Sequence, residues 1–159
     1  MSDRPFTIRI EGNVAFFDGV LNEFADLDPL KTITGHLIMD LAGLGRTNSM
    51  GLRLMLKVIV GWANRSFTYR NCPPDFIEQI NMIPAMLGQK RTGKVESILA
   101  PYYCEEDDEE VYLPRDIKVF ADFINGGPCP PEPCPQCGGD MEIESRDFFL
   151  FETYYRSAG

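Results

Sequence analysis

The chain is poor in the residues on which catalytic sites and membrane spans usually depend. Its 159 residues include one histidine and one tryptophan. The longest apolar stretch, residues 52–63, is interrupted by Arg53 and Lys57, so it is too short and too polar to cross a bilayer. The first twelve residues have neither the basic start nor the apolar middle of a signal peptide. We therefore expect a cytoplasmic protein without a membrane span.

Catalytic constellations are also missing from the sequence. It contains no recognisable carboxylate pair, no serine–histidine pairing, no glycine-rich phosphate loop and no open metal triad. His36 has no second histidine or acid at the spacing of metal ligands, and Cys72 has no base that would activate its thiol. The chain is therefore predicted not to be an enzyme.

Positive charge is scarce in the second half of the chain only. Residues 1–90 hold nine Lys/Arg and nine Asp/Glu, whereas residues 91–159 hold six against fifteen, which accounts for the whole net charge of −9. A surface that repels phosphate gains no affinity from counterion release, so we expect no nucleic-acid partner. Four of the five cysteines also lie in the second half. We therefore expect two unlike parts, a domain over residues 1–100 and an acidic subdomain over residues 101–159.

The first part alternates between strand-like and helix-like hydrophobic patterns. Strands are predicted at residues 6–12, 13–17, 36–41, 66–71 and 94–99, with the first two joined as a hairpin. Helices are predicted at residues 20–27, at residues 49–63 and from residue 73 onward, and residues 42–48 are expected to form a loop. Strands separated by helices indicate an α/β fold with an open mixed sheet.

One segment of this part carries a motif around a serine. An apolar strand leads to the start of a helix at Asn48-Ser49-Met50-Gly51-Leu52, and the next strand is followed by Asn71, Pro73 and Pro74. In order and spacing these elements resemble a STAS domain, the fold of bacterial anti-sigma factor antagonists, over roughly residues 5–100.

The resemblance implies a role for each residue of the motif. Ser49 corresponds to the serine that a partner kinase phosphorylates, and Asn48 and Gly51 belong to the supporting loop. The partner implied by the family is a serine kinase that also acts as an anti-sigma factor, and it binds only the unphosphorylated form tightly. Asn48 stands where the family has an aspartate, and its amide cannot accept a proton.

Elementary electrostatics allow such a switch at Ser49. A helix N-terminus favours negative charge, so a phosphate there leaves folding intact while adding about −1.5 to −2 charges that a partner must desolvate. The alternative is that Ser49 or Asn48 simply caps the helix, which is worth about 1 kcal/mol.

The second part contains a cysteine knuckle. Cys134 and Cys137, followed by two glycines, have the spacing and turn chemistry of tetrahedral zinc ligands. Cys104 resembles the start of a partner knuckle, but Asp107 stands where its second cysteine is expected. A structural zinc ion is therefore predicted on Cys104, Cys134 and Cys137, with either Cys129 or Asp107 as the fourth ligand.

Two alternatives remain for this part, a metal-free ribbon and a redox dithiol at Cys134 and Cys137. The dithiol fits poorly because redox motifs open a helix, whereas Gly138 and Gly139 follow here. Residues 141–151 are expected to form a terminal hairpin of a small antiparallel zinc-ribbon-like subdomain.

Two functions follow from these patterns. The first is a non-enzymatic regulator that resembles an anti-sigma factor antagonist and binds a protein partner under the control of Ser49 phosphorylation. The second is a STAS-like interaction scaffold that has lost the switch and docks a partner through its acidic ribbon.

Overall fold

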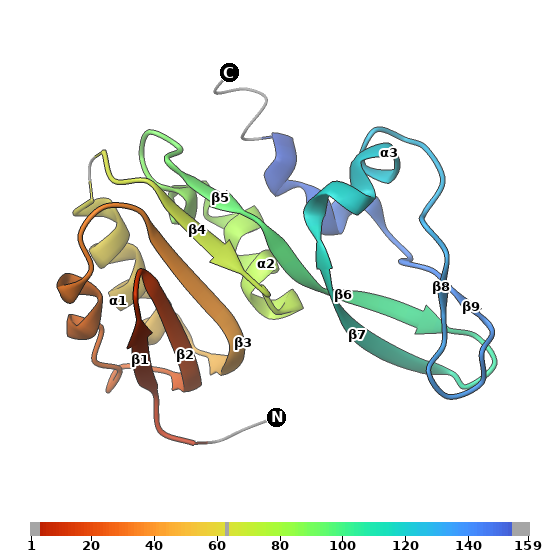
Figure 1. The fold of residues 1–159 in the computed structure, drawn as a ribbon, viewed down its shortest axis with the longest axis horizontal. Helices are drawn as coiled ribbons and strands as arrows, with labels where there is room; N and C mark the ends of the chain where they lie inside the picture. The colour runs from red at the N-terminus through yellow and green to blue at the C-terminus, as the bar shows by residue number, and fades with distance from the viewer. Residues whose placement is uncertain (1–3, 63, 154–159) are drawn as a thin grey trace.

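The molecule consists of two lobes that lie end to end (Figure 1). The computed structural model describes residues 4–62 and 64–153. Residues 4–62 and 64–95 form the sheet lobe, and residues 97–153 form the ribbon lobe. Strand β6 (Ser97–Cys104) leaves the sheet lobe and runs into the ribbon lobe, so it crosses the boundary predicted at residue 100.

The sheet lobe is built on a five-stranded mixed sheet with the strand order β1-β2-β3-β4-β5. Its strands are β1 (Thr7–Glu11), β2 (Val14–Leu21), β3 (Leu37–Thr47), β4 (Phe67–Arg70) and β5 (Gly93–Val95). β1 and β2 form the predicted antiparallel hairpin, and the remaining neighbours are parallel. Gly12 adopts a φ of 61° between β1 and β2, a conformation that costs glycine little. The mixed α/β architecture is therefore confirmed.

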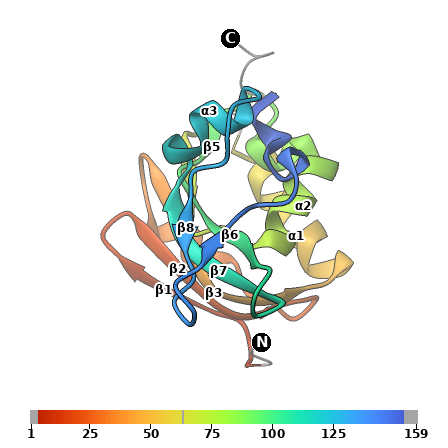
Figure 2. The ribbon, with the colours of Figure 1, turned by 90° about the vertical axis from the view of Figure 1, so that its right-hand side faces the viewer.

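Two helices cover one face of this sheet (Figure 2). They are α1 (Ser49–Val60) and α2 (Pro74–Met82), with the 3-10 helices η1 (Asp28–Thr32) and η2 (Pro84–Leu87) beside them. The helices bury apolar side chains at helical spacing, namely Leu52, Met55 and Ile59 of α1 and Phe76, Ile77 and Ile80 of α2. Residue 63, the predicted end of the first of these helices, lies outside the described residues, and α1 ends at Val60.

The helix predicted at residues 20–27 is wrong. β2 continues to Leu21, and the short helix η1 begins only at Asp28. Phe24, which the helical pattern placed on the buried face, is 84% exposed. Pairing of β2 with β3, which reaches as far as Leu21 and Thr47, overrides the local spacing of apolar residues.

The loop predicted at residues 42–48 is also wrong, because β3 continues to Thr47. Gly43 explains why this segment looks like a loop in the sequence. A Cβ atom at Gly43 would lie 2.7 Å from the carbonyl oxygen of Phe17, so the glycine allows β2 and β3 to approach at an irregularity in their pairing. The strand predicted at residues 94–99 is divided at Glu96 into β5 and β6.

The ribbon lobe is a long hairpin with short elements packed on it. β6 pairs antiparallel with β7 (Glu109–Asp116), and β8 (Glu132–Pro133) pairs antiparallel with β9 (Asp140–Met141). The 3-10 helices η3 (Ile117–Phe120) and η4 (Arg146–Phe149) and the short helix α3 (Ala121–Ile124) complete the lobe. Its core is aromatic, with the rings of Phe120 and Phe149 5.0 Å apart.

The terminal hairpin predicted at residues 141–151 is not formed. Met141 lies in β9, but the aromatic run enters η4 instead of a returning strand. Ser145 caps η4 by accepting a hydrogen bond from the Asp147 N–H at 3.1 Å. The guanidinium of Arg146 donates to the carbonyl oxygens of Phe123, Gly126 and Gly127, which fixes the turn against α3. These contacts depend on residues distant in the sequence.

A buried polar network joins the two lobes. Asp40, which is 7% exposed, accepts hydrogen bonds from Arg70 Nε at 2.9 Å and from Asn71 Nδ2 at 3.2 Å. The Ser97 hydroxyl in turn accepts from the Asn71 N–H at 2.9 Å. An isolated parallel β-bridge between Cys72 and Ile98 adds a backbone contact at the start of β6. The network and this bridge connect the end of β4 to the first residues of the ribbon lobe.

Candidate functional site

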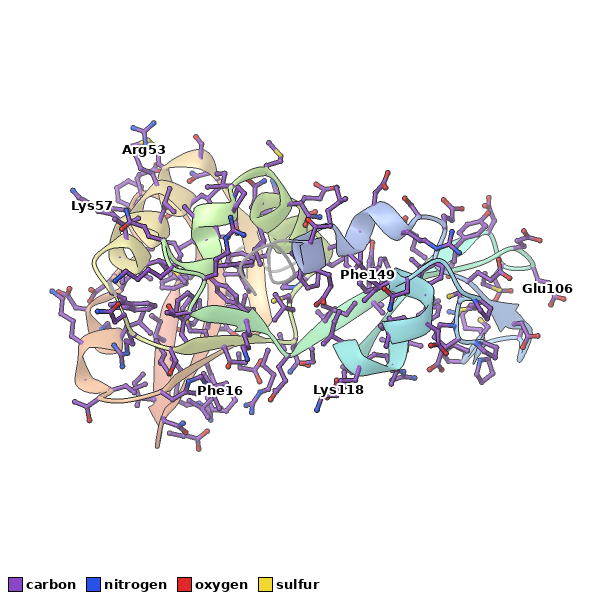
Figure 3. All side chains as sticks on the ribbon, turned by 90° about the horizontal axis from the view of Figure 1, so that it is seen from above. Phe16, Arg53, Lys57, Glu106, Lys118 and Phe149 are labelled. Carbon is purple, nitrogen blue, oxygen red and sulfur yellow. The ribbon has the colours of Figure 1, made fainter. Side chains whose placement is uncertain are left out.

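Four potential metal ligands gather at the far end of the ribbon lobe. Cys104 ends β6, Asp107 lies in the turn to β7, and Cys134 and Cys137 lie in the turn between β8 and β9. One ligand atom from each of these residues lies within 4.8 Å of the other three. Figure 3 shows the neighbouring Glu106 at this end of the molecule, opposite Arg53 and Lys57.

Turn geometry explains how Cys134 and Cys137 converge. Gly138 has a φ of 76° and donates its N–H to the Cys134 carbonyl oxygen at 2.8 Å, which closes the turn. The Cys134 N–H donates to the Gly139 carbonyl oxygen at 2.8 Å. The Gly139 N–H points at Cys137 Sγ at 3.4 Å, as expected for a knuckle that stabilises a thiolate. The knuckle predicted from the two cysteines and two glycines is present.

The distances between the ligand atoms match the edges of a metal tetrahedron. Cys104 Sγ lies 3.5 Å from Cys137 Sγ, and Cys134 Sγ lies 3.3 Å from Asp107 Oδ2. Cys104 Sγ lies 3.7 Å from the same carboxylate oxygen. A tetrahedral ion with zinc–sulfur bonds of about 2.3 Å has sulfur–sulfur edges of about 3.8 Å. One ion therefore fits between the four side chains with little rearrangement.

The surroundings of Cys137 favour the neutral thiol when no cation is bound. The Gly139 N–H lowers its pKa, but hydrogen bonds with Cys104, Cys134 and Glu106, together with partial removal from water, outweigh this and raise the pKa to about 12. A bound divalent cation reverses this balance because it coordinates the deprotonated sulfur. Cys104 and Cys134 are buried, whereas Cys137 is exposed, so an ion can enter from the Cys137 side.

The structure distinguishes between the two residues predicted as the fourth ligand. Asp107 is in the cluster, and Cys129 is not. The Cys129 thiol instead donates to the Pro130 carbonyl oxygen at 3.6 Å. The segment between Cys129 and Cys134 contains three prolines, whose fixed φ keeps it extended and prevents it from folding back.

Ser49 is exposed at the first residue of α1. The N-cap is Asn48, whose Oδ1 accepts a hydrogen bond from the Gly51 N–H at 2.8 Å, so the cap belongs to Asn48 and not to Ser49. Asn48 Nδ2 donates to Glu23 Oε2 at 3.0 Å, which lowers the pKa of Glu23. Both ends of the Asn48 amide are therefore engaged.

Gly51 has a steric role in the same loop. A Cβ atom at this position would lie 2.3 Å from the Leu21 carbonyl oxygen, which is too close for any residue with a side chain. The Asn48 N–H also donates to this oxygen at 3.0 Å. Gly51 therefore lets the first turn of α1 rest directly on the end of β2, which fixes the position of Ser49.

A groove of about 370 Å3 opens beside Ser49 between α1 and α2. Its lining includes Leu52, Arg53, Leu56 and Ile83, so it is mainly apolar with one cation. Two exposed apolar side chains are linked to the Ser49 region by sequence or by a neighbour's contact. Met50 follows Ser49 and is 46% exposed, and Phe24, which is 84% exposed, follows Glu23, whose carboxylate binds Asn48. Exposure of apolar side chains next to a groove is typical of a contact surface.

The remaining predicted candidates have local, structural partners. His36 lies between two hydroxyl groups, with Nδ1 2.8 Å from Ser66 Oγ and Nε2 2.8 Å from Thr68 Oγ1. Cys72 is fully buried, and burial, followed by the nearby Asp40 charge, raises the pKa of its thiol well above the ordinary value. The exposure of Phe24 and the burial of Asp40 were not expected, because each depends on pairing with distant strands.

Comparison with known proteins gives no match to a protein-family model, to a curated protein or to a solved structure. The STAS-like assignment made from the motif residues therefore stays a prediction. No helix in residues 4–62 or 64–153 is long and apolar enough to cross a membrane.

Proposed function

We propose that the chain is a non-enzymatic regulatory protein that binds a protein partner through the surface around Ser49. The supporting observation is the position of Ser49, exposed at the start of α1 beside a groove with exposed apolar neighbours. Binding buries this surface, and phosphorylation of Ser49 opposes binding because the phosphate must then lose its water.

The division of roles between Asn48 and Ser49 supports a switch that leaves the fold intact. Asn48 holds the helix cap, so the Ser49 hydroxyl is available for modification without loss of that hydrogen bond. The first turn of α1 has no acidic residue, so a phosphate there meets the positive end of the helix dipole without carboxylate repulsion from the same turn.

The STAS-like interpretation also belongs to this proposal. A parallel strand, β3, leads directly into α1, and Gly51 holds the helix start against β2. The order of a strand followed by a helix that begins at the Ser49 motif agrees with the resemblance to anti-sigma factor antagonists, although β3 occupies residues 42–47, where a loop was expected. The partner class is accordingly a serine kinase that acts as an anti-sigma factor.

For the cluster in the ribbon lobe we propose a structural zinc ion on Cys104, Asp107, Cys134 and Cys137. Three thiolates and one carboxylate suit zinc, which accepts sulfur and oxygen in a tetrahedron. Four protein ligands leave no open position for water, so the ion would stabilise a zinc-ribbon-like subdomain and would not act in catalysis.

A charge variant and a neutral variant of Ser49 test the switch. The chain is incubated with a bacterial serine-kinase anti-sigma factor and ATP, and a mass increase of about 80 Da that Ser49→Ala abolishes supports the proposal. Ser49→Asp should weaken binding of that kinase, whereas Ser49→Ala should keep it. Equal binding by the wild type and both variants would leave Ser49 without a regulatory role.

The alternative function, a scaffold without the switch, has one observation in its favour. Asn48 replaces the family's aspartate and is fully engaged with Gly51 and Glu23, so it cannot serve as a base for Ser49. In this case the exposed acidic turn at the tip of the ribbon lobe docks the partner. Replacing Glu105 and Glu106 by lysine would then abolish partner binding, and Ser49→Asp would not affect it.

A further inference from the structure

A second, separate cavity of about 690 Å3 lies where the edge strand β5 meets η3. Its volume falls in the range of about 300–1,000 Å3 that is usual for small-molecule sites. Figure 3 shows Lys118, from its lining, on the side of the molecule opposite Arg53 and Lys57. The cavity shares no lining residue with the groove beside Ser49 or with the metal cluster.

Four cationic side chains line this cavity, namely Lys90, Arg91, Lys94 and Lys118. Three carboxylates share the lining, so its formal charge is +1, in a chain whose net charge is −9. Neither Lys94 nor Lys118 forms a salt bridge with any residue in the described part of the chain. Cations held together at a cavity create a positive potential that attracts an anion.

Backbone contacts bring the elements that carry Lys94 and Lys118 together at the cavity. Gly93 and Val95 are buried on the helix side of β5, so Lys94 projects from the other face, beside its register partner Thr68. The Ile117 N–H donates to the Glu96 carbonyl oxygen at 3.0 Å, which attaches η3 to the end of β5. Lys118, the residue after Ile117, thereby lines the same cavity as Lys94.

Lys90 and Arg91 come from the loop that precedes β5. Arg91 has a φ of 57°, a conformation that is costly for a residue with a Cβ atom and is often found at binding sites. Lys90 Nζ donates to Asn64 Oδ1 at 3.0 Å, which restrains its side chain. The cavity thus has one pair of cations from this loop and a second pair from β5 and η3.

Carboxylates in the same lining limit which anions fit. Glu96, Asp116 and Glu152 also line the cavity. The Asp116 carboxylate already accepts a hydrogen bond from the Lys118 N–H at 2.8 Å. A bare polyanion would be repelled by these groups, whereas hydroxyl groups of an organic ligand can donate to them. A ligand with phosphates that accept from the cations and hydroxyls that donate to the carboxylates matches both kinds of group in the lining.

We propose that this cavity binds a small, soluble organic molecule with two phosphate groups and free hydroxyl groups. The ligand is held by charge-assisted hydrogen bonds from the two cation pairs, one pair for each phosphate. This site does not depend on the function proposed for Ser49, because the two surfaces lie on different sides of the molecule.

Calorimetric titration of the full chain with fructose 1,6-bisphosphate, with fructose 6-phosphate as the matched probe, tests this proposal. The bisphosphate should bind at one site and at least about tenfold more tightly, because a charge-assisted contact is worth that factor or more. Lys94→Gln and Lys118→Gln should each weaken binding by about tenfold. Lys57→Gln, an equal charge change on α1, should leave affinity unchanged. All three lysines are exposed, so unchanged melting temperatures serve as the folding control.

Three results would overturn the proposal. The first is no heat of binding with the bisphosphate at millimolar concentration. The second is an equal loss of affinity in Lys57→Gln, which would indicate attraction to general surface charge. The third is equal affinity for the two sugar phosphates. Sedimentation with vesicles that contain a phosphatidylinositol bisphosphate distinguishes the source of the phosphates, because binding to these vesicles without binding to the soluble probe would contradict a soluble ligand.

Discussion

The sheet lobe and the ribbon lobe are stabilised in different ways. The sheet lobe has a layered core, in which alternate residues of the strands pack against the apolar faces of α1 and α2. The ribbon lobe has one long hairpin, several short elements and an aromatic cluster around Phe120 and Phe149. Its outer end, where β8 and β9 have two residues each, holds the cysteine cluster next to the buried Met141 of β9.

This difference indicates where each lobe is vulnerable. Regular layers distribute stability over many contacts, whereas short elements bury little area and need a local cross-link. A metal ion on four ligands supplies such a cross-link to the ribbon lobe. We therefore expect the two lobes to respond differently to loss of metal, to steric changes and to pH.

The largest expected effect is the loss of metal from the ribbon lobe. Protein purified without chelator should contain about one zinc per chain, and Cys134→Ser should abolish it. Structural zinc contributes about 10–16 kcal/mol of binding free energy in small zinc domains, so its loss should unfold the outer end of the ribbon lobe. Elemental analysis and amide hydrogen exchange measure the two effects, and protection of β2 and β3 should be retained.

Cys129→Ser and Cys72→Ala are the controls for this experiment. Neither residue is in the cluster, so both variants should keep full zinc content. Loss of zinc in Cys129→Ser would show that the fourth ligand is not Asp107. Zinc far below one per chain in the wild type would show that the ribbon lobe is stable without metal.

The next largest effect is expected from Gly51→Ala in the sheet lobe. The added Cβ atom would lie 2.3 Å from the Leu21 carbonyl oxygen. Neither the backbone at the end of β2 nor that of the first turn of α1 can move freely to relieve this contact. Overpacking of this kind typically costs about 1–3 kcal/mol, and a backbone clash should reach the upper end. Urea unfolding measures the change in unfolding free energy.

Gly61→Ala is the matched control, since the nearest atom to an added Cβ there is 3.3 Å away and φ is −68°. This variant should be nearly neutral. Equal destabilisation by both variants would show that the contact with β2 does not decide the effect, because Gly→Ala by itself raises helix propensity.

The same contrast between lobes explains how much could be predicted from the sequence. The hairpin of β1 and β2, the start of α1 at Ser49 and the position of α2 followed from periodicity and capping, which are local signals. The helix predicted at residues 20–27 failed because β3 recruits Leu21 into a strand. Local spacing carries no information about such pairing.

In the ribbon lobe the chemistry was more predictable than the shape. Three cysteines of the cluster followed from their spacing, and Asp107 was one of two predicted alternatives for the fourth position. The choice of Asp107 and the helical turn of the terminal aromatic residues depend on how distant segments pack. The contacts of Arg146 with the carbonyl oxygens of α3 and its following turn are of this kind.

A pH effect of intermediate size is expected from Cys72 in the sheet lobe. The pKa of the Cys72 thiol is raised above its ordinary value of 9.0, first by burial and then by Asp40, so the folded chain retains this proton where the unfolded chain loses it. Stability is therefore fully present below about pH 9 and falls by about 1.4 kcal/mol per pH unit above it.

Unfolding free energies of the wild type and Cys72→Ala between pH 8 and pH 10 measure this term, because other titrating groups are common to both. The difference between the two should narrow as the pH rises. A difference that is constant with pH, or rapid alkylation of Cys72 in the folded chain, would contradict its burial as the cause.

The smallest effects are expected at the start of α1, and they separate capping from signalling. Asn48→Ala removes the hydrogen bond to the Gly51 N–H and should cost about 1 kcal/mol, whereas Ser49→Ala removes no cap and should change stability by less than about 0.5 kcal/mol. Thermal unfolding measures both. If Ser49→Ala proved as costly as Asn48→Ala, Ser49 would have a structural role that explains its presence without a switch. If it is neutral, the hydroxyl contributes nothing to the fold, so the loss of partner binding in Ser49→Asp can be assigned to the binding surface and not to a weakened helix cap.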